Sequence, residues 1–212
     1  MKVFYLIICG ICTKAKMIVN NDSISTQIPY YLTQEAKQGL IKALKDFPEK
    51  TNYFTNLYPN ELLQGDGIKS LEVLRFEDGS RKSIKGILLT NSCDMDLKNK
   101  REFPIKLTFA PLIKLDNYIN LLKQHNLDSE KIDNKICSIK EQKITYIFYL
   151  PKDSYLEDDH IALLNDLHTI PLSALEKVDK NSKLFTLSQV GFYLFIFKLS
   201  VHFCRFHENV ER

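Results

Sequence analysis

The sequence predicts an α+β domain in which a small antiparallel sheet, or an SH3-like barrel, is packed against an N-terminal helix and a long C-terminal helix. Three observations predict this fold class. The chain has 212 residues, 44% of them hydrophobic, and can therefore bury a sizeable core. Its middle alternates short apolar, β-branched and aromatic runs with turn residues. Its last segment has apolar residues at helical spacing, which adds a long helix to the predicted sheet.

The first sixteen residues, MKVFYLIICGICTKAK, form an apolar leader. They resemble the start of a signal peptide but lack a clear cleavage site, and they are too short to span a bilayer. The alternative is a misassigned start, with Met17 as the true first residue. Either way, residues 17–212 are expected to form one domain. The five cysteines are odd in number and contain one CxxC pair, which favours a reduced, cytoplasmic protein.

The first predicted helix covers residues 33–47, where Thr33 is a suitable cap and Pro48 follows the end. Two strands are then expected at residues 68–76 and 83–90. The sequence EDGS lies between them and predicts a hairpin.

A third strand is predicted at residues 105–113, and Pro111 should place it at a sheet edge or end it. Residues 116–127 have helical spacing, and residues 144–151 are typical of a fourth strand. Residues 160–172 fit either a strand that runs into a short turn or a helix that stops before a proline.

The C-terminal segment from Leu187 to Arg212 is the longest predicted helix. One face carries an apolar stripe, and another carries a basic stripe of Lys198, His202, Arg205 and Arg212. Because the net charge of the chain is only +3, any site for nucleic acid must be local. The basic stripe is the predicted contact for phosphates or for an acidic partner surface. Its alternative is an ordinary solvated face.

The sequence TNSCDMD predicts a sharp turn after an apolar strand. Cys93 there is a candidate nucleophile, with His160 or His168 as the base and Asp94 or Asp159 as the group that orients it. The alternative is a buried cysteine followed by aspartates that cap the turn.

No metal or cofactor is predicted. Asp94 and Asp96 with the sequence EDDH at residues 157–160 have the chemistry of a Mg²⁺ or Mn²⁺ site, but no fixed spacing links the two segments. His202 and His207 are five apart on the predicted helix, which turns them away from each other and excludes a helical zinc pair. Seven glycines leave no glycine-rich phosphate loop.

The order of the middle strands resembles the MazF/PemK-like toxin family over about residues 62–175. The matching features are Gly65-Asp66 before a strand, the strand GILLTNS, the strand end FAPLI, and a last edge from residues 160–172. The family has an arginine beside a proline and a threonine after its strand end, and both support RNA cleavage. Here Lys85 and Gly86 stand at the first position and Ile113 at the second. The resemblance therefore implies a small barrel, with Lys85 as a match in charge only.

Two functional hypotheses follow. The first is a nucleic-acid-binding, toxin-like protein of a bacterial conflict or phage-defence system, with endoribonuclease-like activity if it is an enzyme, and with RNA and an antitoxin as partners. The second is a non-enzymatic subunit of a defence complex. It depends on the apolar sequence VGFYLFIFKLSVHF, which must be buried on nearly all sides or face a partner. A cysteine hydrolase using Cys93 is a third, weaker hypothesis.

Overall fold

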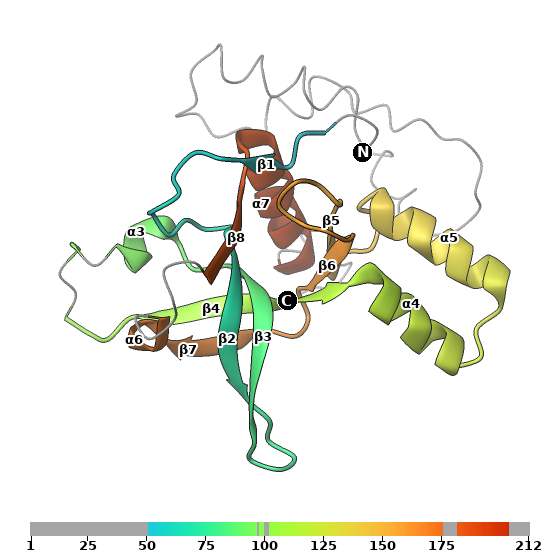
Figure 1. Ribbon diagram of the computed structural model, residues 1–212, viewed down its shortest axis with the longest axis horizontal. Helices are drawn as coiled ribbons and strands as arrows, with labels where there is room; N and C mark the ends of the chain where they lie inside the picture. The colour runs from blue at the N-terminus through green and yellow to red at the C-terminus, as the bar shows by residue number, and fades with distance from the viewer. Residues whose placement is uncertain (1–50, 97, 100–101, 176–181, 204–212) are drawn as a thin grey trace, which may run out of the picture.

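The computed structural model describes residues 51–96, 98–99, 102–175 and 182–203 (Figure 1). Within these ranges the protein is a mixture of helices and one strongly curled antiparallel sheet, compatible with a small barrel. The strands are β1 (Phe54–Thr55), β2 (Gly67–Leu74), β3 (Arg81–Leu88), β4 (Lys106–Lys114), β5 (Ile147–Leu150), β6 (His160–Leu163), β7 (His168–Pro171) and β8 (Lys183–Leu187). The helices are α3 (Ser92–Met95), α4 (Leu115–Gln124), α5 (Ser129–Lys140), α6 (Leu172–Leu175) and α7 (Gln189–Phe203).

The sheet has the order β1-β8-β2-β3-β4-β6-β5, and β7 also pairs with β4. The predicted hairpin is confirmed as β2–β3, in which Leu71 is opposite Ile84. The predicted strands at residues 105–113 and 144–151 are β4 and β5. The segment 160–172 forms two strands, β6 and β7, so the alternative of a single helix there is wrong.

Pro111 corrects one prediction, because it lies inside β4 and not at an edge or end of the sheet. On one side it is opposite Gly86 of β3. On the other side β4 pairs with β7 up to Phe109 and with β6 from Leu112 onward. Proline has no N–H to donate to a ladder. Its position at the point where β4 changes partner makes this loss tolerable within a central strand.

The two faces of the sheet bury different cores, because successive side chains of a strand point to opposite sides. Ile87 and Leu112 lie in one core with Phe148, Phe185 and Phe195. The neighbouring Leu88 lies in a second core, which fills the curl of β2, β3, β4 and β7. A third core lies between the α4–α5 helix pair and strands β5 and β6.

Helix α7 covers the first core and approaches the chain before β1 closely. A Cβ on Gly191 would lie 2.3 Å from the carbonyl oxygen of Tyr53, so only glycine allows this contact. The helix begins at Gln189, two residues later than predicted, because Leu187 belongs to β8. No helix within the described ranges is long and apolar enough to cross a membrane.

Helix α5 and strands β1 and β8 were not predicted from the sequence. The predicted helix at residues 33–47, the leader at residues 1–16 and the end of the C-terminal helix from residue 204 lie outside the described residues.

Candidate functional site

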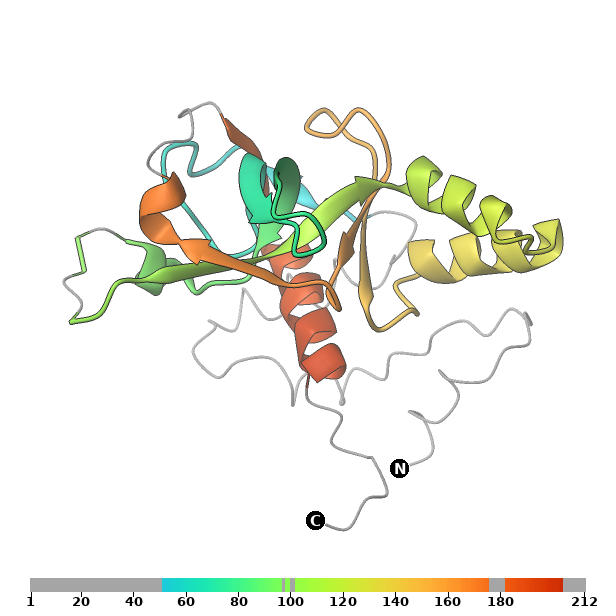
Figure 2. The same ribbon diagram turned by 90° about the horizontal axis from the view of Figure 1, so that it is seen from below.

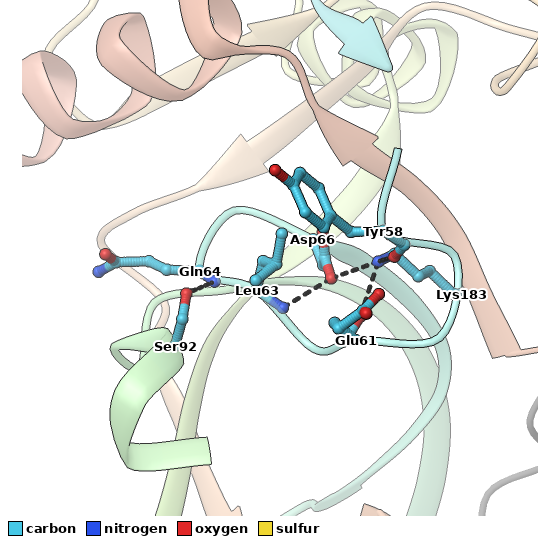
Figure 3. Close-up of polar contacts among 7 residues, drawn as sticks. All are labelled: Tyr58, Glu61, Leu63, Gln64, Asp66, Ser92 and Lys183. Carbon is cyan, nitrogen blue, oxygen red and sulfur yellow. Dashed lines mark hydrogen bonds and ion pairs between the residues drawn. The ribbon is translucent and has the colours of Figure 1, made fainter. Parts of the chain in front are cut away.

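Residues 56–66 form a loop, here called the clasp loop, that is held by one lysine of β8 (Figure 3). The Nζ atom of Lys183 donates to the carbonyl oxygens of Tyr58 and Glu61, both at 2.8 Å. It also lies 2.8 Å from Oδ2 of Asp66. Three acceptors match the three N–H groups of an ammonium, so the lysine is fully satisfied by the loop.

Asp66 is the buried anion of this arrangement, with no exposed surface. Its Oδ2 also accepts a hydrogen bond from the backbone N–H of Leu63 at 2.8 Å. Burial raises the pKa of Asp66, while the hydrogen bonds from Lys183 and Leu63 act in the opposite direction. Gly65 precedes it with a φ of 90°, a backbone conformation that favours glycine. The local structure therefore explains why glycine and aspartate stand at positions 65 and 66, independently of any activity.

The clasp loop is joined to the turn that contains Cys93. The backbone N–H of Gln64 donates to Oγ of Ser92 at 2.9 Å, and its side-chain amide donates to the carbonyl oxygen of Leu89 at 2.6 Å. Gly65 donates to the carbonyl of Leu88 at 2.8 Å. The Gly65-Asp66 pair and the SCD turn therefore lie together at one end of β3.

Cys93 is exposed in the short helix α3. The side chain of Asn91 caps this helix by accepting from the backbone N–H of Cys93 at 3.1 Å. Asp94 is exposed, and Asp96 accepts from the backbone N–H of Lys98 at 2.9 Å. The turn is thus capped by its own polar side chains, as the alternative interpretation expected, but its cysteine is not buried.

Lys85 belongs to a different group of residues, here called the Lys85 cluster, which consists of Lys85, Lys114 and His160. Lys85 is opposite Leu112, two residues before Lys114, and Lys114 is opposite His160. This register places the three side chains on one face of the sheet, on strands β3, β4 and β6. Lys114 also forms an ion pair with Asp158 at 2.5 Å.

His160 is 2% exposed, and its Nδ1 lies 2.8 Å from the carbonyl oxygen of Asp158. A carbonyl can only accept, so Nδ1 carries the proton and Nε2 is left as the basic atom. Burial lowers the pKa of His160, and the positive charges of Lys85 and Lys114 lower it further. The cluster thus contains a neutral imidazole beside two ammonium groups.

The turn that contains Cys93 is far from the Lys85 cluster. The backbone N–H of Thr108 in β4 donates to Oγ1 of Thr90, just before Cys93, whereas His160 is opposite Lys114. Six residues of extended strand correspond to about 20 Å. The structure therefore does not bring Cys93 and His160 together, and Lys85 lies nearer to His160 than to Cys93.

The two aspartates of the EDDH segment form ion pairs with lysines. Asp158 pairs with Lys114, and Asp159 pairs with Lys140 at 3.0 Å. Asp159 also accepts from the backbone N–H of Lys152 at 2.8 Å. Among the residues that the structure describes, no three His, Cys, Asp or Glu side chains gather as a metal site would require.

The predicted basic stripe required Lys198 to lie on an open face of the helix, and it does not. It is 5% exposed, and its Nζ donates to the carbonyl oxygen of Gln142. Burial lowers the pKa of Lys198 to about 7. His202 is partly buried, with its ring centroid 4.6 Å from that of Phe203. Arg205 and Arg212 lie outside the described residues, so the role of the basic stripe stays a prediction.

Gln142 joins three parts of the fold. Its side-chain amide donates to the carbonyl oxygen of Tyr149 at 2.7 Å, and its Oε1 accepts from the N–H of Tyr149 at 3.1 Å. These two hydrogen bonds have the pattern that a neighbouring strand would form with β5, which is the last strand in the sheet order. Its backbone carbonyl receives Lys198, and its amide lies 3.3 Å from the hydroxyl of Tyr53.

No family model matches the chain, and a search of curated proteins finds no match. The resemblance to MazF/PemK-like toxins therefore stays a prediction. Sequence reasoning missed Lys183 and Gln142, which make the most contacts in the polar groups described above. A weak signal for Lys183 was its position at the start of KLFTL, a run typical of a strand.

Proposed function

We propose that the protein is a non-enzymatic subunit that binds a partner protein through helix α7. The observation that carries this proposal is an exposed stripe on that helix. Phe197 is 43% exposed and Phe203 is 55% exposed, and the small Ser200 is exposed midway between them. Residues three apart on a helix lie on neighbouring parts of its surface, so the stripe is continuous.

The partner surface that fits this stripe is the apolar face of another helix. Phe197, Ser200 and Phe203 are three residues apart and form one row of side chains, and such rows pack into the grooves between side chains of a neighbouring helix. The opposite side of α7 is already used, because Phe195 is fully buried in the first core. Phenylalanine is also among the residues enriched at protein–protein interfaces.

The charge distribution also favours a protein partner over nucleic acid. Lys198, the first cation of the predicted basic stripe, is buried, and Lys114 and Lys140 are paired with Asp158 and Asp159. Cations that already have carboxylate partners gain little from a phosphate.

The test is a double variant, Phe197→Ser with Phe203→Ser, compared with Leu121→Ser. Leu121 is 49% exposed on α4 and provides the same change of chemistry on another helix. The wild-type chain alone should self-associate in light scattering, and the double variant should not. Co-purification with the product of a neighbouring gene should be lost in the double variant and kept in Leu121→Ser. A monomeric wild-type chain that binds no neighbouring product would refute the proposal.

A second candidate function, binding of nucleic-acid phosphates by a toxin-like protein, is favoured by the Lys85 cluster. Lys85 is exposed on β3, on the same sheet face as His160, and could bind a phosphate there. We expect Lys85→Ala to weaken RNA binding and to reduce its salt dependence, with the α4 residue Lys123→Ala as control. Growth arrest on induced expression, from Met1 and separately from Met17, would make this function primary. Normal growth with folded protein would count against it.

A further inference from the structure

Helix α7 has three buried residues, and the last of them is a lysine. They are Gly191, Phe195 and Lys198. A lysine is rarely buried this fully unless it is paired with an opposite charge. The residues that follow it in the helix, 199–203, are half-buried or exposed. Lys198 is therefore the last buried point at which the helix is held to the rest of the protein.

The acceptor of Lys198 is a backbone carbonyl at the end of helix α5. Its Nζ donates to the carbonyl oxygen of Gln142, in the turn that joins α5 to β5 beside α7 (Figure 2). The N–H of Gln142 donates to the carbonyl of Ile139 at 2.9 Å, and that of Lys143 donates to Ser138 at 2.8 Å. With a φ of 58° at Gln142, this is the Schellman motif that ends many helices. The acceptor is thus held in place by α5.

The titratable groups around this contact offer no charge that would balance an ammonium. Those next to Gln142 and Lys198 are Tyr53, Glu141, Lys143, Tyr149 and His202. Glu141 is already paired with Lys143. Burial raises the pKa of both tyrosines, so they stay neutral, and His202 can add only positive charge. Burial lowers the pKa of Lys198 to about 7, and no described carboxylate opposes this effect.

The two protonation states of Lys198 favour different positions of the helix. A neutral amine can stay against the carbonyl of Gln142, whereas a buried ammonium without a partner charge is costly. Once the helix end moves into water, the pKa of Lys198 returns to its ordinary 10.5. Between these two values the released helix holds a proton that the docked helix lacks. Release therefore becomes easier as the pH falls through this window.

We propose that Lys198 is a latch that holds residues 196–203 of α7 against Gln142 as a neutral amine and releases them when it takes up a proton. The first half of the helix stays docked, because Gly191 and Phe195 do not titrate. The exposed stripe of α7 belongs mainly to the half that is released, so its position on the protein changes with pH. The inference concerns the chain by itself and goes beyond the proposed function.

The experiment measures amide hydrogen exchange of the full chain at pH 7.0 and pH 8.5. A helical segment without packing is marginal in water, so release should expose the amides of residues 199–203 to exchange. Their protection, corrected for intrinsic exchange, should be about tenfold higher at pH 8.5. It should be lower than that of β4 at both values, because release does not unfold the sheet. Lys198→Met has a similar volume and no titratable group, and should remove the pH dependence. The matched control His202→Gln should keep it.

Four results would overturn the proposal: equal protection of residues 199–203 at both pH values in the wild type, a pH dependence retained in Lys198→Met, a pH dependence lost in His202→Gln, or protection equal to that of β4. The last result would mean that the helix end opens only when the whole domain unfolds. The comparison within the wild type does not require any variant to fold. Failure of the proposed function would not affect these outcomes, because the chain is measured without a partner.

Discussion

The Nζ atom of Lys183 lies 2.8 Å from Oδ2 of Asp66, and neither side chain is open to solvent: Lys183 is 13% exposed and Asp66 is fully buried. This ion pair fastens the clasp loop to β8. Breaking a buried pair by removing one partner is costly, because the remaining charge stays buried without compensation.

Asp66→Ala should therefore lower the free energy of unfolding by about 3–5 kcal/mol. Asp66→Asn keeps an oxygen that can accept from both Lys183 and the N–H of Leu63, so its loss should be smaller. Urea denaturation of the two variants measures the difference. Equal losses in both would show that the charge of Asp66, and not merely an acceptor, is required.

Gln142→Ala should destabilise the protein by about 1–2 kcal/mol, because it removes both hydrogen bonds to the backbone of Tyr149. Amide hydrogen exchange should become faster at Tyr149 in particular. Gln142→Gly loses the same bonds, but Gln142 has a φ of 58°, which glycine adopts more easily. The glycine variant should therefore be more stable than the alanine variant by about 1 kcal/mol. Unchanged exchange at Tyr149 would contradict the edge-strand role.

Lys198 should make the free energy of unfolding depend on pH in the alkaline range. Its pKa is lowered from 10.5 to about 7, so between these values the unfolded chain binds more protons than the folded one. The free energy of unfolding should then rise with pH across this window, by up to about 1.4 kcal/mol per pH unit relative to Lys198→Met. Urea titrations of both proteins at pH 7.5 and 9.5 test this. Parallel pH profiles would show that Lys198 is not held away from water.

Lys85→Ala should raise the pKa of His160, because it removes a positive charge that disfavours the imidazolium. Burial is the larger cause of the lowered pKa, so the value should stay below the ordinary 6.5. A titration of the His160 ring followed by NMR gives the result. Lys123→Ala, on α4, is the control that should leave it unchanged.

Cys93→Ala should leave stability within about 0.5 kcal/mol of the wild type, because the side chain is exposed. Circular dichroism and urea unfolding check this. With folding preserved, any activity lost in this variant would be chemical in origin and would support the third hypothesis. A large loss of stability would instead mean that the thiol contributes to packing.

The sequence predicted the parts of the fold whose signals are local. The EDGS turn between two apolar runs gave the β2–β3 hairpin, and helical spacing gave α4 and α7. Residues 160–172 were ambiguous, because short apolar runs fit either a strand or a helix. Pro111 was misplaced because a general rule about proline in sheets does not anticipate a strand that changes partner midway.

The candidate site was less predictable, because its contacts depend on distant segments. Only the resemblance to the MazF/PemK-like family points to Asp66, and nothing near Asp66 in the sequence points to Lys183. Lys198 has the spacing of a basic stripe, yet tertiary packing buries it against Gln142. Periodicity shows which residues share a helix face, but not which face the rest of the chain covers.

The pairing of β1 with β8 has a consequence for synthesis on the ribosome. Phe54 is opposite Leu187, and Oγ of Ser188 donates to the carbonyl of Asn52 across 136 positions of the chain. Asn52 and Phe54 leave the ribosome before Leu187 and Ser188 are translated. Phe54 therefore cannot pair with Leu187 until the residues between them have been synthesised. Contacts of such long range slow folding and leave apolar surface uncovered in nascent chains. A chaperone, or a partner that binds during translation, would have its greatest effect in that interval.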